Sequence, residues 1–152
     1  MIASRKVEKC AEACKNLSAL GVKAVPVKCD MASDADIKNL VDTTMKEFGR
    51  IDILVNNVGA STDGPHVVDK PYDQIEYEVN VNYWSVIHCC KAVAPVMMER
   101  RWGRIVNLGS GVALVGRAGD SIYAASKAAS DHFVRACWCR HIISQPATAV
   151  HE

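Results

Sequence analysis

Two apolar periodicities alternate along this chain, and that alternation limits the fold more than any other feature of the sequence. Apolar residues recur at helical spacing in four stretches, residues 5–20, 33–49, 72–101 and 121–139. Short apolar runs that favour strands lie between them, at residues 22–30, 51–57 and 103–110. Helices that alternate with strands predict one α/β domain with a mainly parallel sheet. In such sheets, the chemistry lies beyond the carboxyl ends of the strands.

Local signals indicate where several of these elements begin, end or bend. Ser33 or Asp34 can cap the second helix, and Gly49 can end it. The stretch 72–101 is typical of two helical pieces joined near Asn80–Asn82. Pro26 predicts an edge position for its strand, because proline has no backbone donor for a neighbouring strand.

The composition excludes several classes of protein. The chain has 152 residues, a formal net charge of +1 and 49% hydrophobic residues, which is typical of a globular domain and not of a nucleic-acid-binding or disordered chain. No apolar run approaches the roughly 20 residues that a membrane-spanning helix needs, and the first ten residues lack an apolar signal-peptide core. We therefore expect a cytoplasmic protein with no nucleic-acid or membrane partner.

The seven cysteines give no disulfide or metal framework. Their number is odd, no C-x-x-C pair occurs, and no set of cysteines and histidines has zinc-finger spacing. Cys10 and Cys14 could share a helix face with a metal, but buried free thiols account for them better. The sequence predicts no metal.

Polar motifs follow two neighbouring strands. "NNVG" at 56–59 ends one strand, and "GSG" at 109–111 ends the next. Tyr123 and Lys127 lie early in the following helix, four residues apart and so on one face. Each residue type has an ordinary interpretation by itself: a tyrosine at the rim of the core, a solvated lysine, a turn serine, and asparagines that satisfy backbone groups. Their order and spacing together favour a catalytic set.

In this order, the motifs resemble those of the short-chain dehydrogenase/reductase family over residues 2–137. "NNVG" is similar to the family's N-N-A-G, with Val58 in place of the usual alanine. Asn82 in "VNYWSV" matches the family's helix asparagine, with Ser85 where glycine is common. "GRIVNLGS" resembles the family's fifth strand. The spacing S-x12-Y-x3-K is met by Ser110, Tyr123 and Lys127. Tyr-x3-Lys alone would be a weak signal, whereas the ordered set is specific.

The resemblance implies hydride transfer between a nicotinamide cofactor and a carbonyl or secondary alcohol, with a side chain that handles the proton. Tyr123 would be the general acid in reduction and the base in oxidation. Lys127 would favour the phenolate through its charge and hold the nicotinamide ribose. Ser110 would donate a hydrogen bond to the substrate oxygen, and Asn82 would position a water that links the lysine to solvent.

The resemblance also assigns cofactor contacts. They fall on Tyr123 and Lys127 and on seven further residues, Ser4, Arg5, Asp30, Met31, Asn57, Val58 and Gly59. Asp30, in "CDM", would contact the adenine amino group, and a helix-capping role explains it as well. Arg5, in "IASR" at the end of the family's second strand, favours NADP because a basic residue suits a 2′-phosphate; NAD is the alternative. An ordinary first-turn arginine accounts for Arg5 equally well. Asn56 is interpreted as structural.

The 152 residues contain only part of the family's pattern. The first strand and the turn T-G-x3-G-x-G have no counterpart, and "CWCRHIISQPATAVHE" matches neither the sixth strand nor the substrate loop. We expect an incomplete, Rossmann-like, doubly wound parallel sheet. A partial NAD(P)-binding domain would cover 1–137, and a divergent, disordered tail from another reading frame or exon would cover 138–152. Strands one and two normally lie between strands three and four, so their absence predicts a gap in the sheet and weak or no NADP binding.

Three interpretations of function follow. The first is an NAD(P)-dependent oxidoreductase of a small carbonyl or alcohol, nearest to the 3-oxoacyl-acyl-carrier-protein-reductase-like or tropinone-reductase-like branches. The second is a non-catalytic, truncated form that acts through dimerisation, because the family's dimer helices, here 83–101 and 123–137, are both present. The third is a binding protein with the same fold, which an intact catalytic set disfavours. The sequence leaves the substrate open.

Overall fold

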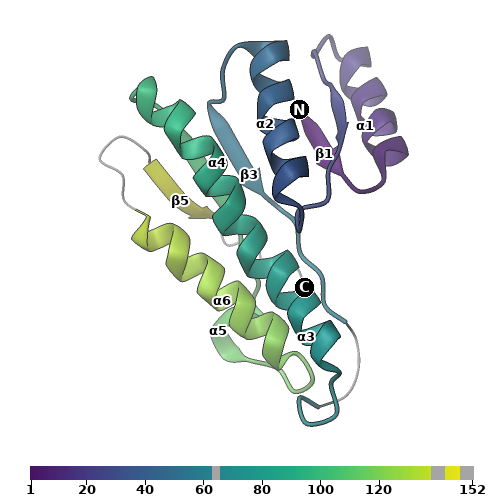
Figure 1. Ribbon diagram of the computed structural model, residues 1–152, viewed down its shortest axis with the longest axis vertical. Helices are drawn as coiled ribbons and strands as arrows, with labels where there is room; N and C mark the ends of the chain where they lie inside the picture. The colour runs from purple at the N-terminus through teal and green to yellow at the C-terminus, as the bar shows by residue number, and fades with distance from the viewer. Residues whose placement is uncertain (63–65, 138–142, 148–152) are drawn as a thin grey trace. The chain divides into compact units, whose positions relative to one another are not determined.

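The computed structural model describes residues 1–62, 66–137 and 143–147 (Figure 1). The chain divides into two compact units, residues 1–50 and residues 51–152, and each unit has a sheet of its own. Helices and parallel strands alternate through both units, as the two apolar periodicities predict.

The first unit is a βαβα segment. It comprises β1 (Ile2–Ser4), α1 (Val7–Ala19), β2 (Pro26–Lys28) and α2 (Asp34–Phe48). β1 and β2 pair in parallel, with Ile2 beside Pro26, so the proline lies on an edge strand as predicted. Side chains from both helices and from the β2 segment form the core: Cys10, Cys14, Val27, Cys29 and Ile37 are buried.

Local capping sets both ends of α2. The Ser33 hydroxyl accepts a hydrogen bond from the Asp36 backbone N–H at 3.2 Å, which satisfies a donor at the helix start. Gly49 ends the helix with a φ of 69°, a left-handed conformation that glycine adopts without steric cost. Of the two predicted caps, Ser33 is therefore the residue that acts.

The second unit contains a three-stranded parallel sheet. Its strand order is β3 (Ile53–Asn56), β4 (Arg104–Leu108) and β5 (Ile143–Ala147). Asn56 of β3 pairs with Asn107 of β4, so the carboxyl ends of these two strands meet at one edge of the sheet. That edge is where the sequence places the polar motifs.

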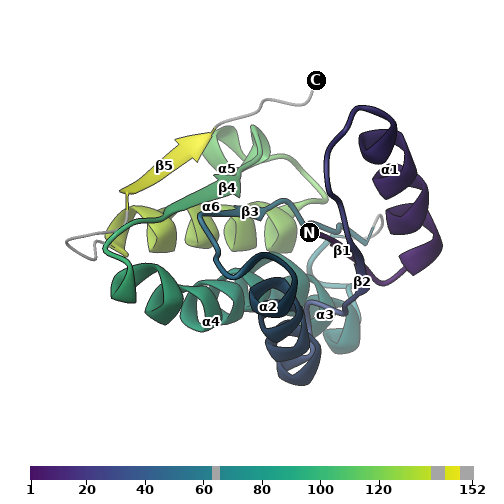
Figure 2. The ribbon, with the colours of Figure 1, turned by 90° about the horizontal axis from the view of Figure 1, so that it is seen from above.

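Two long helices, α4 (Ser85–Glu99) and α6 (Ser121–Ala136), lie side by side on one face of this sheet (Figure 2). Apolar side chains from the helices and from β4 form the core: Val86, Val93, Met97, Ile105 and Val134 are buried. A short helix, α5 (Val112–Val115), lies between β4 and α6 along the chain.

The stretch 72–101 is made of three consecutive helical segments. These are α3 (Tyr72–Val79), a π-helical turn η1 (Asn80–Trp84), and α4. The predicted junction near Asn80–Asn82 is thus confirmed, and its form is a π turn. Such turns interrupt the regular hydrogen-bond ladder and are frequent at functional sites.

The tail corrects one expectation. We expected a disordered tail over 138–152, but residues 143–147 form β5, which pairs in parallel with β4 from Ile143 beside Arg104 to Ala147 beside Leu108. Pairing the backbone groups of β4 outweighs the weak strand propensity of a segment that contains Pro146. A proline costs little on an outer strand, where its missing donor faces away from the ladder. The remaining parts of the predicted tail, 138–142 and 148–152, lie outside the described residues.

The strands of each unit pair within one sheet. β1 and β2 form the sheet of the first unit, and β3, β4 and β5 form the sheet of the second. The gap between the family's strands three and four stays a prediction. Among the described residues, β3 pairs only with β4. Ile53 and Val55, which share one face of β3, are each more than half exposed.

Candidate active site

Lys127 lies at the carboxyl ends of two neighbouring strands. It is on α6, is 5% exposed, and its Nζ donates hydrogen bonds to the backbone carbonyls of Val58 (3.1 Å) and Leu108 (3.3 Å). Leu108 ends β4, and Val58 lies two residues after β3. Burial lowers the pKa of Lys127 because it removes water from the charged form. The alternative of a solvated surface lysine is therefore wrong.

Gly59 allows this lysine to approach the loop that follows β3. A Cβ atom at residue 59 would lie 3.0 Å from Lys127 Nζ and 3.3 Å from Asn82 Oδ1. Both separations are shorter than ordinary van der Waals contact. The missing side chain thus leaves the space in which the ammonium and the amide reach the loop backbone.

Asn82 is fully buried in η1, and its side-chain amide is hydrogen-bonded to backbone on both sides. Nδ2 donates to the carbonyls of Ala60 (2.6 Å) and Glu78 (2.8 Å), while Oδ1 accepts from the Ala60 N–H (3.0 Å). The carbonyl of Asn82 accepts a hydrogen bond from the Ser130 hydroxyl at 2.5 Å. Asn82 therefore fastens the loop to the π turn, and its contact with a water stays a prediction.

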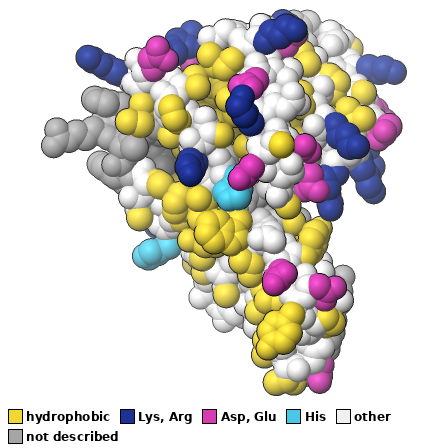
Figure 3. Space-filling model, in the orientation of Figure 1, with side chains coloured by type: hydrophobic (Ala, Val, Ile, Leu, Met, Phe, Trp, Pro, Cys, Tyr) yellow, Lys and Arg dark blue, Asp and Glu magenta, His cyan; other side chains and the backbone are white. Residues whose placement is uncertain are grey.

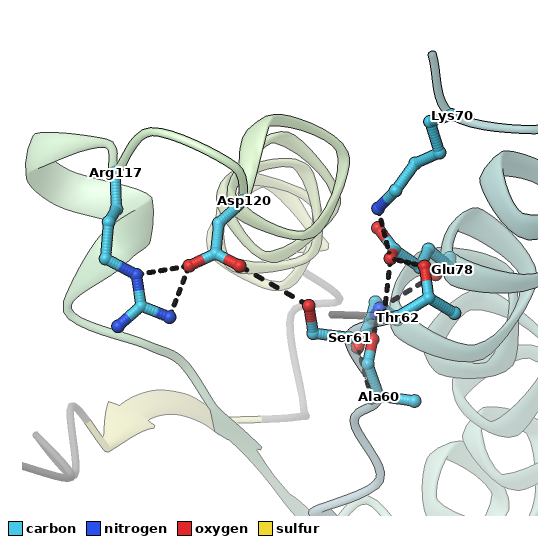
Figure 4. Close-up of polar contacts among 8 residues, drawn as sticks. Ala60, Ser61, Thr62, Lys70, Glu78, Arg117 and Asp120 are labelled. Atoms are coloured by element: carbon cyan, nitrogen blue, oxygen red, sulfur yellow. Dashed lines mark hydrogen bonds and ion pairs between the residues drawn. The ribbon is translucent and has the colours of Figure 1, made fainter. Parts of the chain in front are cut away.

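The sequence did not suggest a buried ion pair that lies near Asn82, between Glu78 on α3 and Lys70 in the loop before this helix. Glu78 is fully buried, and its Oε1 accepts hydrogen bonds from Lys70 Nζ (2.5 Å), from the Thr62 backbone N–H (2.7 Å) and from the Thr62 hydroxyl (Figure 4). Burial by itself would raise the pKa of Glu78. The hydrogen bonds from Lys70 and Thr62 and the charge of Lys70 outweigh burial, so the pKa is lowered and the carboxylate stays charged.

A second polar contact links the same loop to the start of α6. Asp120 directly precedes this helix and is buried. One of its carboxylate oxygens pairs with the Arg117 guanidinium, and the other accepts from the Ser61 hydroxyl at 3.4 Å (Figure 4). The loop after β3 is thus connected to the beginning of the helix that carries Tyr123 and Lys127.

Tyr123 and Ser110 have hydroxyls without a partner among the described residues. Tyr123 is half-buried on α6, one turn before Lys127 and on the same face. Ser110 lies two residues after β4 and is also half-buried. Neither hydroxyl makes a hydrogen bond to another residue that the structure describes. Their contacts with a substrate or cofactor stay predictions.

Apart from Tyr123 and Lys127 on α6, the predicted cofactor residues fall into two groups, one in each unit. Those after β3, in the second unit, are Asn57, Val58 and Gly59, and all three are exposed. In the first unit, Ser4 ends β1, Arg5 follows it, and Asp30 and Met31 lie shortly after β2. In the first unit, Ser4 is beside Lys28, so the residues that follow β1 and β2 start from the same end of that sheet.

The polar residues of the first unit's group act locally in turns. Asp30 Oδ1 accepts a hydrogen bond from the Ala32 N–H at 3.0 Å, while Ser33 caps α2, so Asp30 is a turn residue and not the helix cap. The Ser4 hydroxyl accepts from the Lys6 N–H at 3.2 Å. Arg5 is exposed.

Asn56 has the structural role that we expected. It is buried and donates to Cys90 Sγ at 3.7 Å. Burial raises the pKa of Cys90 to about 11, although the hydrogen bond from Asn56 opposes the shift. The cysteines within the described residues are all free thiols, and five of these six are buried.

Neither a metal-binding cluster nor a membrane span is found in the described ranges. Within them, no three histidine, cysteine or acidic residues are grouped so that they could hold a metal ion. No helix there is both long enough and apolar enough to cross a bilayer.

Comparison with known proteins identifies the family. The sequence profile of the short chain dehydrogenase family matches residues 1–142. The chain belongs to this family. Two relatives are 3-oxoacyl-[acyl-carrier-protein] reductases, one from Homo sapiens (36% identical over 77% of this chain and 49% of that protein) and one from Pseudomonas aeruginosa (37% over 85% and 51%). The chain therefore spans about half the length of the curated relatives it matches.

Solved structures show the same fold for this short-chain dehydrogenase chain. A metagenomic short-chain oxidoreductase in complex with NADP matches with a TM-score of 0.90 at 24% identity, over 95% of this chain and 67% of that one. The protein gox2181 matches with a TM-score of 0.90 at 26% identity, over 97% and 60%. The parallel α/β architecture is thus the Rossmann-type fold that the motifs indicate.

Sequence reasoning missed three residues that hold the loop in this short-chain dehydrogenase, namely Thr62, Lys70 and Glu78. Glu78 has the pattern of an ordinary charge on an amphipathic helix. One signal was available: it lies four residues before Asn82, and residues at this spacing share a helix face. Lys70 and Thr62 lie in loops and carry no comparable signal.

Proposed function

We propose that this chain carries the proton-transfer site of a nicotinamide-dependent oxidoreductase that acts on a carbonyl or a secondary alcohol. The observation that supports this most is the setting of Lys127. Two of the three hydrogens of its ammonium are used by the carbonyls of Val58 and Leu108. The third remains for a ligand hydroxyl, and Tyr123 lies one helical turn away on the same face.

Tyr123 exchanges the proton in this proposal. In reduction, its hydroxyl donates a proton to the carbonyl oxygen as negative charge develops there; in oxidation, the phenolate accepts the proton of the alcohol. The ammonium of Lys127 favours the phenolate. Ser110 donates a hydrogen bond to the same substrate oxygen and stabilises its charge. A bound nicotinamide would supply or accept the hydride.

The residues after β3 fit the nicotinamide end of such a cofactor. Asn57, Val58 and Gly59 are exposed at the carboxyl end of the strand, and the missing side chain of Gly59 lets Lys127 Nζ lie close to this segment. The unused donor of Lys127 would hold a ribose hydroxyl beside them. Asn82 keeps this segment in place through Ala60.

NADP is the proposed cofactor, with NAD as the alternative. Arg5 is exposed directly after β1, where a guanidinium suits a 2′-phosphate. One solved structure with the same fold is in complex with NADP. The 152 residues include no T-G-x3-G-x-G turn to hold the pyrophosphate, so we expect them to bind NADP weakly. We place the protein in the cytosol.

The proposed substrate is a small molecule with a ketone or a secondary alcohol. The names of the relatives include 3-oxoacyl-[acyl-carrier-protein] reductases and a 7alpha-hydroxysteroid dehydrogenase of Escherichia coli, 34% identical over 76% of this chain. Acyl thioesters and steroids differ in size and polarity, so the shared chemistry is limited to the carbonyl–alcohol pair.

A second candidate is a non-catalytic chain that acts by forming oligomers. It is favoured by apolar side chains on α4 and at its start. Trp84 and Met98 are each nearly half exposed. Figure 3 shows hydrophobic side chains gathered over the region where Figure 1 draws α4. Residues 83–101 and 123–137 would form the contact between two copies.

Isotope transfer distinguishes the two candidates. The chain is incubated with butane-2,3-dione and millimolar NADPH that carries deuterium at the transferred position of the nicotinamide, and the alcohol is analysed by mass spectrometry. The oxidoreductase predicts one deuterium on the carbinol carbon. A folded protein that gives no labelled alcohol supports the non-catalytic candidate. Tyr72→Phe, at an exposed tyrosine of α3, is the matched control for Tyr123→Phe.

A further inference from the structure

A single carboxylate oxygen joins both ends of the loop between β3 and α3. Glu78 Oε1 accepts from the N–H and hydroxyl of Thr62, near the start of the loop, and from the ammonium of Lys70, at its end. In Figure 4 the side chains of Lys70 and Thr62 converge on Glu78. The acid is completely buried and the Lys70 side chain is 2% exposed. No function that we have described uses this pair.

A series of hydrogen bonds connects the Lys70–Glu78 pair to Lys127 in the proposed site. The backbone carbonyl of Glu78 accepts from Asn82 Nδ2 at 2.8 Å, and Asn82 binds both backbone groups of Ala60. Two residues earlier, the carbonyl of Val58 accepts from Lys127. Loop segment 58–62 is thus held at three points, by α6, by η1 and by α3.

A gain in stability does not by itself explain why Lys70 and Glu78 form a buried ion pair. Moving two charges out of water is costly, and replacing a buried ion pair by apolar residues of similar size is often neutral or stabilising. A buried pair can instead select one arrangement of the groups around it, because an unpaired charge in any other arrangement would be penalised. Here the groups selected are backbone atoms of a loop that contacts Asn82 and Lys127.

We propose that Lys70 and Glu78 are positioning residues that fix loop segment 58–62 and, through Asn82 and the Val58 carbonyl, set the place and the solvation of the Lys127 ammonium. Their meaning for catalysis rests on the proposed function. The positioning itself is a property of the folded chain and is measurable without cofactor or turnover.

The test uses four variants and two controls. Glu78→Gln and Lys70→Met each remove one charge, Lys70→Met/Glu78→Gln removes both and leaves no unpaired buried charge, and Thr62→Val removes only a hydroxyl. Glu76→Gln on α3 and Lys91→Met on α4 make the same chemical changes at exposed positions. Urea unfolding gives global stability for each protein.

Two measurements report on positioning. Hydrogen exchange of the Ala60 amide reports on a bond to Asn82, not to Glu78. The pH titration of the Lys127 ε-carbon, followed by carbon-13 NMR, reports on how far water reaches the ammonium. Some variants will unfold at the same urea concentration as the wild type. If the pair affected only global stability, both the Ala60 exchange rate and the Lys127 titration would be unchanged in those variants.

We expect Ala60 to exchange about tenfold faster in Thr62→Val and in the double variant, and the pKa of Lys127 to rise toward its ordinary value in both. The controls should match the wild type. If the single variants do not fold, the double variant and Thr62→Val still decide the question. Wild-type exchange and titration in the folded double variant would overturn the proposal, whether or not Thr62→Val changes them. A chain without turnover would contradict the proposed function and leave both measurements intact.

Discussion

The backbone carbonyl of Glu78 and the side-chain amide of Asn82 are hydrogen-bonded at 2.8 Å, so a buried acid and the asparagine of the π turn are joined directly within one helical stretch. Both residues are fully buried, and both also bind the loop after β3, at Thr62 and Ala60. The helix therefore holds the loop at two adjacent places.

Changing the Asn82 amide to a carboxylate should destabilise the fold strongly. In Asn82→Asp, carboxylate oxygens would face the carbonyls of Ala60 and Glu78, which would lose their donor. We expect the free energy of unfolding to fall by about 3 kcal/mol, because buried carbonyls would be left unsatisfied beside a charge. Asn80→Asp, in the same π turn but exposed, should change it by less than about 0.5 kcal/mol. Equal urea midpoints for the two variants would contradict the assigned hydrogen bonds.

Acid should remove the stabilisation that Glu78 provides. Because the folded-state pKa of Glu78 is lowered from 4.5, the native state binds fewer protons than the unfolded state below this pH. The contribution is complete above about pH 4.5 and is lost as pH falls toward the folded-state value, with a slope of up to about 1.4 kcal/mol per pH unit. Urea unfolding between pH 3 and 6 measures the slope.

The same titration in two variants isolates this group. Glu78→Gln, paired with Lys70→Met so that no buried lysine is left alone, should show a shallower dependence on pH. Glu76→Gln, at an exposed acid of the same helix, should keep the wild-type slope. An unchanged slope in the double variant would show that Glu78 does not titrate with folding.

A methyl group at residue 59 should displace the lysine. In Gly59→Ala, the new atom would lie 3.0 Å from Lys127 Nζ and 3.1 Å from its Cε, so the end of this buried side chain must shift. We expect a loss of about 1–2 kcal/mol in the free energy of unfolding, which is the usual cost of overpacking. Gly109→Ala is the control, because a methyl group there would meet no heavy atom within 4 Å beyond its own chain neighbours. Similar thermal unfolding of both variants would argue against the close approach.

Much of the fold follows from local patterns in the sequence. Ser33 and Gly49 predicted the ends of α2, and the asparagines Asn80 and Asn82 predicted the helix junction, because capping and breaking signals act within a few residues. β5 was not predicted. Its segment contains Pro146, and its pairing depends on the available edge of β4, which no local pattern records.

In the candidate site, too, the residues within local motifs were predicted, and those that depend on distant partners were not. Lys127 was found because it belongs to a motif with fixed spacing, and Asn82 because "VNYWSV" resembles a helix segment of the family. The structure adds that both are buried against the loop backbone. Glu78 and Lys70 were missed, because a charged residue is buried only when partners from elsewhere satisfy it. Here one of those partners is Thr62, at the other end of a loop.

The most direct test of the account is the initial rate of butane-2,3-dione reduction by Tyr123→Phe relative to the wild type, at millimolar NADPH. Phenylalanine keeps the ring and removes only the hydroxyl that transfers the proton, so we predict a fall in rate of about 10²–10⁴-fold, with Tyr72→Phe unchanged. A folded Tyr123→Phe variant that reduces the diketone at the wild-type rate would contradict the account.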